Sequence, residues 1–126
     1  MNTKLIMSAS ALLMGSTGIL LTFLPQETAG AIGWANGSTI VLQLVGALYF
    51  GFAMLNWMSK ANLIGGIYNR PVAVGNLTHF FIAALALVKL TGKNPVLIGV
   101  AIVYFLFAIA FGYILFTHPI RDSKTE

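Results

Sequence analysis

Four long apolar runs dominate this sequence, and a proline marks nearly every boundary between a run and its connection. The runs cover residues 4–24, 39–58, 71–90 and 95–117. The prolines are Pro25, Pro71, Pro95 and Pro119, and none lies in the interior of a run. An apolar helix of about 20 residues spans the roughly 30 Å hydrocarbon core of a bilayer. The sequence therefore predicts an all-α polytopic membrane protein, an up-and-down bundle of four transmembrane helices.

The composition supports this interpretation. Of the 126 residues, 58% are hydrophobic and 8% are charged, whereas an average soluble domain is about 25% charged. The short connections leave no room for a soluble domain, so residues 1–126 are expected to form a single four-helix domain. The chain has no cysteine, which excludes disulfides and thiol nucleophiles. Its net charge is +4, and the basic residues lie at the ends of the apolar runs. This placement indicates that they orient the protein in the membrane, and we expect no nucleic-acid partner.

The first run could be a secretory signal peptide or a retained helix. Lys4 followed by an apolar stretch is typical of a signal peptide. The apolar stretch continues to Leu24, however, and this is longer than the 7–15 residues usual in such a peptide. We expect a retained transmembrane helix.

The connections carry turn and stop signals. Residues 25–38 are expected to form a loop that contains a turn at Asn36-Gly37. The second connection has a break at Gly65-Gly66, and Gly92 is a stop for the helix 71–90. Asn94 followed by Pro95 predicts the start of the last helix. Because the third connection is about five residues long, the helices 71–90 and 95–117 must be antiparallel neighbours.

The basic residues predict the orientation. Lys and Arg accumulate in cytoplasmic segments of membrane proteins. One side would carry five of these residues, namely Lys4, Lys60, Arg70, Arg121 and Lys124, and the other side two, Lys89 and Lys93. We expect a multi-pass protein of the cell membrane, such as a bacterial inner membrane, with both termini in the cytoplasm.

Acidic residues are absent from all four runs, since the three acids are Glu27, Asp122 and Glu126. Proton- or cation-coupled transport usually needs a carboxylate within the membrane. Small multidrug transporters have a similar length and four helices, but they depend on a Glu in the first helix. A transporter role is therefore disfavoured.

The helix 71–90 carries the best candidate site. A set of small and polar residues falls on one of its faces at helical spacing: Val72, Gly75, Asn76, His79, Ala83 and Ala86. His79 lies about 12 Å along the helix from Pro71, close to the middle of the membrane. An ionisable residue there indicates a ligand or proton site. The alternative is a neutral histidine that hydrogen-bonds across helices and holds the bundle together.

The helix 39–58 could add to this site. Asn56 is expected near Asn76 and His79 in the cytoplasmic half, with Tyr49 deeper in the membrane. The candidate ligand-binding residues are His79, Asn76, Asn56, Tyr49 and Gln43. The competing interpretation is again structural, with each hydrogen bond between helices worth about 0.6 kcal/mol. His118, at a membrane edge, is too isolated to suggest a metal site, so no metal is expected.

Three pairs of small residues at four-residue spacing permit close helix contact: Ala11 and Gly15, Ala47 and Gly51, and Ala108 and Gly112. We expect all three to pack within the monomer.

Two segments carry a resemblance to a known family, LVGALYFGFAMLNW at residues 44–57 and YNRPVAVGNLTHFFIAALAL at residues 68–87. With the helix and loop that precede them, they resemble small bacterial membrane proteins that are broadly DoxX-like. The resemblance covers most of the chain. It implies an up-and-down four-helix membrane bundle and assigns no chemistry to individual residues.

Three functions remain open. The first is a non-enzymatic protein of the lipid bilayer that packs with a second copy or with a larger membrane partner. The second is a binder or carrier of a small apolar molecule, such as a lipid or quinone, at the candidate ligand-binding residues. The third is a membrane-embedded enzyme, which is disfavoured because the core offers no carboxylate or thiol. We therefore expect no catalytic residues and no cofactor.

Overall fold

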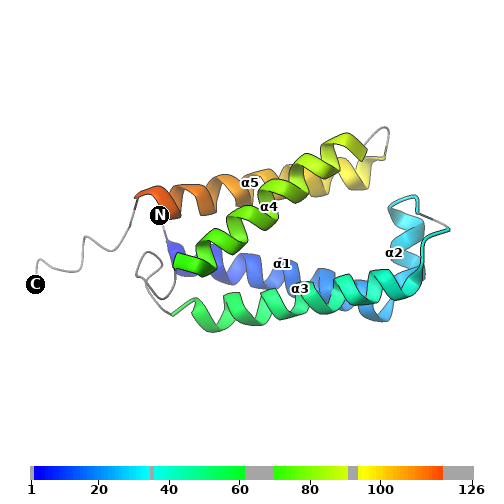
Figure 1. The fold of residues 1–126 in the computed structure, drawn as a ribbon, viewed down its shortest axis with the longest axis horizontal. Coiled ribbons are helices and arrows are strands. Elements are labelled where there is room, and N and C mark those ends of the chain that lie inside the picture. The colour runs from blue at the N-terminus through cyan, green and yellow to red at the C-terminus, as the bar shows by residue number, and fades with distance from the viewer. Residues whose placement is uncertain (1, 35, 62–69, 91–93, 118–126) are drawn as a thin grey trace, which may run out of the picture. The chain divides into compact units, whose positions relative to one another are not determined.

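The structure is a computed structural model that describes residues 2–34, 36–61, 70–90 and 94–117. These residues form helices and connecting turns, with no strand among them (Figure 1). The helices are α1 (Thr3–Phe23), α2 (Pro25–Ala31), α3 (Thr39–Ser59), α4 (Arg70–Leu90) and α5 (Pro95–Thr117). The predicted break at Gly65-Gly66 and the predicted stop at Gly92 lie outside the described residues.

The four long helices begin and end within one residue of the predicted ranges. Each is long and apolar enough to cross a membrane. At 1.5 Å per residue, the 21 residues of α1 extend about 32 Å, which matches the hydrocarbon core. Helix length and composition thus identify a multi-pass membrane protein. The start of α5 is also as predicted, because the side-chain oxygen Oδ1 of Asn94 accepts a hydrogen bond from the backbone N–H of Val96 at 3.0 Å.

The predicted loop at residues 25–38 is wrong in its first half, where α2 forms a short helix. Pro25 occupies the first helical position, where its missing N–H has no cost, and Glu27 lies in the first turn, where a negative charge is favoured. Ala29 is buried in an apolar cluster with Leu21 and Leu42. This burial between sequence-distant residues stabilises a helix that local sequence signals alone leave ambiguous.

A glycine ends α2. Gly33 has a φ of 78°, a left-handed conformation that favours glycine. The N–H of Trp34 donates to the carbonyl of Ala29 at 2.8 Å, and the N–H of Gly33 donates to that of Gly30 at 3.2 Å. This pair of bonds is the Schellman motif, which satisfies carbonyls at the end of a helix. Beyond it, the N–H of Gly37 donates to the carbonyl of Trp34 at 3.1 Å.

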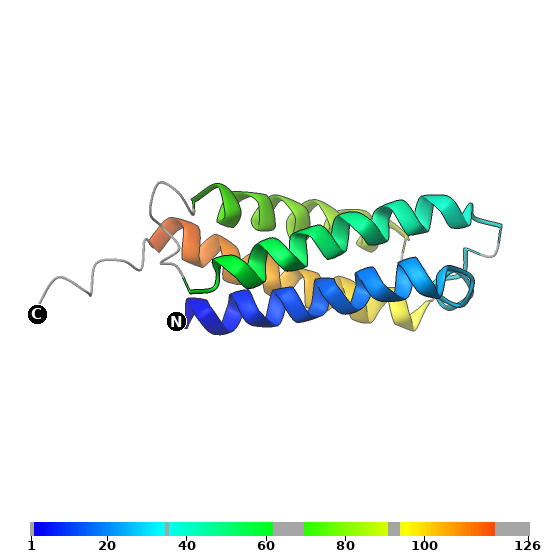
Figure 2. The ribbon, with the colours of Figure 1, turned by 90° about the horizontal axis from the view of Figure 1, so that it is seen from below.

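The contacts divide the chain into two compact units, residues 7–58 and residues 59–126 with residues 1–6, and each is described by itself. In the first unit, α1 and α3 lie side by side, and α2 lies crosswise at one end of the pair (Figures 1 and 2). Two glycines bring the helix backbones together. A Cβ atom on Gly18 would lie 2.8 Å from the carbonyl oxygen of Gly46, and a Cβ atom on Gly46 would lie 2.9 Å from that of Gly18.

In the second unit, α4 packs against α5. Leu77 of α4 lies against Gly112 near the end of α5, with 3.6 Å between the leucine Cδ1 and a Cβ built on the glycine. The ring of Phe80 lies against three aromatic rings of α5, those of Tyr104, Phe107 and Phe111, with centroid distances of 5.0–5.9 Å. The aromatic cluster formed by these four residues joins the two helices, which are antiparallel neighbours as predicted.

The three pairs of small residues do not share one role. Ala11 is buried, and a Cβ on Gly15 would lie 3.4 Å from the Cβ of Ala53, so this pair packs on α3. Ala108 is likewise buried, next to the Gly112 contact with α4. Ala47 and Gly51, by contrast, do not pack within the first unit, where both are exposed. No atom lies within 4 Å of a Cβ built on Gly51.

We expect Gly46→Ala to destabilise the protein by roughly 1–3 kcal/mol, because overpacking a close contact has a cost of this size. The new methyl group would lie 2.6 Å from Thr22 Oγ1 and 2.9 Å from a backbone oxygen that cannot rotate away. Gly51→Ala on the same helix is the matched control and should leave stability unchanged or raise it. Thermal unfolding in detergent measures both. Equal destabilisation by the two changes would contradict the close approach of α1 and α3.

Candidate functional site

Asn56, a predicted site residue, joins α3 to α1. Its Nδ2 donates a hydrogen bond to Ser10 Oγ at 3.1 Å and lies 3.8 Å from Met14 Sδ. Ser10 Oγ in turn donates to the carbonyl of Met7 at 2.9 Å. Asn56 and Ser10 are both 0% exposed. The amide group is therefore part of a bonded chain between two helices, which is the structural role proposed as the alternative for this residue.

Gln43, the next predicted residue, joins the same two helices near their other end. Its Nε2 donates to the backbone carbonyl of Thr22 at 3.3 Å. The start of α3 thus meets the end of α1, whereas Asn56 near the end of α3 meets the start of α1. The two hydrogen bonds together establish that α1 and α3 are antiparallel.

Tyr49 lies between these two bonds along α3. It is partly buried and packs against the apolar cluster of Leu21, Ala29 and Leu42. The ring therefore supports the packing of α2 on the long helices.

Asn76 and His79 share a face of α4, one turn apart, as predicted. Asn76 is 0% exposed, and its Nδ2 donates to the carbonyl of Val72 in the preceding turn at 2.9 Å. His79 is half-buried. Its ring centroid lies 5.1 Å from that of Phe80 and 5.8 Å from that of Tyr104. The imidazole thus adjoins the aromatic cluster that joins α4 to α5.

The predicted residues fall in both units. Gln43, Tyr49 and Asn56 belong to the first, and Asn76 and His79 belong to the second. A meeting of Asn56 with Asn76 and His79 stays a prediction. His118 lies outside the described residues. Among the residues that the structure describes, no three His, Asp or Glu side chains are grouped as metal ligands would be.

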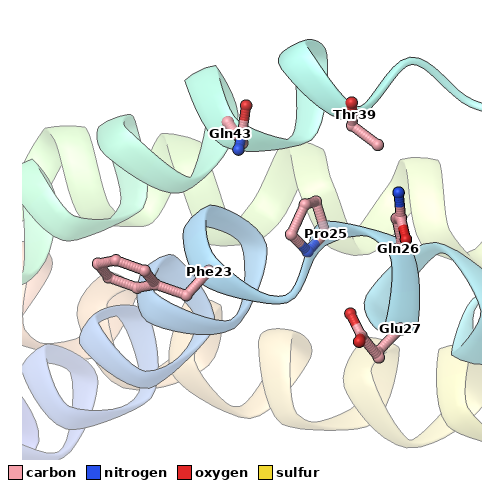
Figure 3. A pocket seen from close by; sticks show the side chains of 6 residues that line it. All are labelled: Phe23, Pro25, Gln26, Glu27, Thr39 and Gln43. Carbon is pink, nitrogen blue, oxygen red and sulfur yellow. The ribbon is translucent and has the colours of Figure 1, made fainter.

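A pocket that the sequence did not indicate opens where α2 lies across the ends of α1 and α3 (Figure 3). Its volume is about 350 Å³, which is at the lower end of the usual range for small-molecule sites. Thr39 and Gln43 of α3 line one side. The other side is formed by Phe23, Pro25, Gln26 and Glu27.

Only Gln43 of these lining residues was a predicted candidate. Pro25, Gln26 and Glu27 were missed because residues 25–38 were interpreted as a loop, and a loop does not fix the direction of its side chains. Phe23 and Thr39 lie at the ends of predicted helices, and only the placement of α2 brings them into one pocket. The available signal was a proline followed two residues later by an acid, which is a pattern typical of a helix start.

No protein-family model, curated protein or solved structure matches this chain. The resemblance to DoxX-like proteins therefore stays a prediction, and the geometry of the chain itself carries the functional interpretation.

A double-mutant cycle tests the bond between α1 and α3. We expect Asn56→Leu and Ser10→Ala to be coupled by about 0.6 kcal/mol, and by no more than about 1.7 kcal/mol, which is the range measured for hydrogen bonds between membrane helices. The free energy of unfolding in mixed detergent micelles measures the coupling.

The control cycle pairs Asn56→Leu with Ser16→Ala. Ser16 is exposed on the same helix as Ser10, and its hydroxyl donates to the carbonyl of Leu12. This second coupling should be close to zero. Additive effects in both cycles would mean that Asn56 does not bond to Ser10.

Proposed function

We propose that this chain is a non-catalytic membrane protein that acts by associating with a second copy of itself. The observation that carries the proposal is a difference between two kinds of residue: the buried polar side chains are bonded within the protein, whereas one pair of small residues is exposed. Buried polar side chains are engaged in hydrogen bonds within the protein, between helices for Asn56 with Ser10 and within α4 for Asn76 with Val72. The pair Ala47 and Gly51, by contrast, faces outward from the first unit and packs against nothing within it.

Small residues at this spacing let two helix backbones approach closely, and such contacts drive association where lipid is as apolar as the side chains. Large apolar side chains border the pair on α3, including Leu44, Leu48 and Met54, which are 61%, 69% and 47% exposed. This surface suits either lipid or another helix. The two exposed small residues favour a helix.

In the proposed arrangement the two hairpins, α1 with α3 and α4 with α5, pack as an up-and-down four-helix bundle in the cell membrane. The DoxX-like resemblance and the lengths of the helices support this. The excess of Lys and Arg supports a cytoplasmic location for both termini. The partner could instead be a larger membrane protein, and a measurement of self-association distinguishes this from a second copy.

Association should depend on Gly51. We expect Gly51→Leu to raise the dissociation constant of the dimer by about fivefold to 150-fold, because a clash at a packed interface costs roughly 1–3 kcal/mol. Energy transfer between labelled copies in liposomes, measured over a range of protein-to-lipid ratios, reports the dissociation constant.

Gly99→Leu on α5 is the matched control, since Gly99 is also exposed and a Cβ there would also meet no atom within 4 Å. It should leave the dissociation constant unchanged. A protein that stays monomeric at every protein-to-lipid ratio would exclude association with a second copy. The partner would then be a different membrane protein.

Single-cysteine labelling tests the orientation, because the chain has no cysteine of its own. Ser38 and Ala61 are exposed positions at the two ends of α3. We expect a membrane-impermeant maleimide to label Ser38→Cys in intact cells and Ala61→Cys only in opened cells. The reverse result would invert the orientation, and labelling of both from one side would contradict the membrane crossing of α3.

Binding of a small apolar molecule, such as a lipid or quinone, is a second candidate function. It is favoured by the position of His79, a half-buried ionisable side chain beside Tyr104 within an apolar helix. If the site binds a ligand, His79→Phe should release it while the protein stays folded, because the aromatic packing is retained. Native mass spectrometry from mild detergent measures the retained ligand. Equal retention in both proteins would leave His79 with a structural role only.

A further inference from the structure

The pocket at the crosswise end of α1 and α3 has an unusual electrostatic setting. Glu27 is the one charged residue in the whole stretch between Lys4 and Lys60. Glu27 lines the pocket, and no hydrogen bond or ion pair joins its side chain to the described part of the chain. The first unit thus carries an uncompensated negative charge on this surface, which attracts cations and repels anions.

The remaining polar groups of the pocket are suited to accept hydrogen bonds. Gln43 Nε2 is engaged with the carbonyl of Thr22, which leaves Gln43 Oε1 as an acceptor. Gln26 and Thr39 add an amide oxygen and a hydroxyl from the two sides of the pocket (Figure 3). Neither side chain bonds to the rest of the described chain. Phe23 contributes an aromatic ring, whose face attracts cations.

The pocket also lies at a defined depth. It is formed by the last residue of α1 and the first turns of α3, and helices of this length place their ends at the level of the lipid headgroups. A ligand at this level can be the headgroup of a lipid or a soluble molecule from the adjoining water.

We propose that this pocket binds a primary ammonium group. An alkylammonium has one positive charge and three N–H donors, which match a lining that combines the acid Glu27 with the neutral oxygens of Gln26, Thr39 and Gln43. A quaternary ammonium offers the charge without the donors, and a phosphate offers the wrong charge. The chemistry is that of an ethanolamine, either free or as a phospholipid headgroup. The proposal is independent of the association through Gly51.

Native mass spectrometry of the full chain in mild detergent tests the site with three lipids of identical acyl chains. The lipids are phosphatidylethanolamine, phosphatidylcholine and phosphatidylglycerol. We expect wild type to retain phosphatidylethanolamine best. Glu27→Gln should reduce its retention by about fivefold, the effect of losing an exposed ion pair of about 1 kcal/mol. The fold should persist, since Glu27 is exposed, and circular dichroism checks it.

Glu126→Gln is the control, because it changes the net charge equally at the last residue of the sequence. It should leave retention unchanged. Free ethanolamine distinguishes the sources: displacement of the lipid supports a soluble amine, and continued retention supports the headgroup. Equal retention of phosphatidylethanolamine in wild type and Glu27→Gln would overturn the site. Retention of phosphatidylcholine as strong as that of phosphatidylethanolamine would overturn the assignment to a primary ammonium.

Discussion

A hydrocarbon interior offers no hydrogen bonds, and this constraint decides where each polar group of the long helices can go. Asn56 bonds to Ser10, Gln43 to the backbone of Thr22, and Asn76 to the backbone of its own helix. Hydroxyl groups behave in the same way, since Ser16 and Thr17 each donate to a carbonyl four residues earlier. The two hairpins differ in the residues that join their helices. Glycines and amides join α1 to α3, whereas aromatic rings join α4 to α5.

The ranges of the four long helices were predictable, because hydropathy and proline depend on neighbouring residues only. The helix α2 was not. It has seven residues, and an isolated helix of that length is marginal in water. Its stability comes from the burial of Ala29 against Leu21 and Leu42, a contact between segments that no local pattern relates. Gly33 ends this helix through the left-handed conformation that a glycine adopts readily.

The candidate site shows a different limit. Sequence singled out Asn56 and Gln43 as candidate ligand-binding residues, because few polar side chains lie in the apolar run 39–58. It could not name their partners, since the choice of neighbouring helix depends on tertiary packing. Ser10 lies 46 residues before Asn56, and no local pattern relates the two. The close approach of Gly18 to Gly46 was missed for the same reason, and the pocket was missed with α2.

The contact between Gly18 and Gly46 has a consequence for how this protein can vary. Glycine has no side-chain rotamers to lose, so the crossing of α1 and α3 carries no side-chain entropy penalty at these two positions. The geometry of the pair depends there on backbone atoms, and not on the shape of the apolar residues around it. Leu12, Leu44 and Leu48 point away from the protein interior. Evolution can therefore exchange these residues to suit membranes of different lipid composition while the helix crossing stays the same.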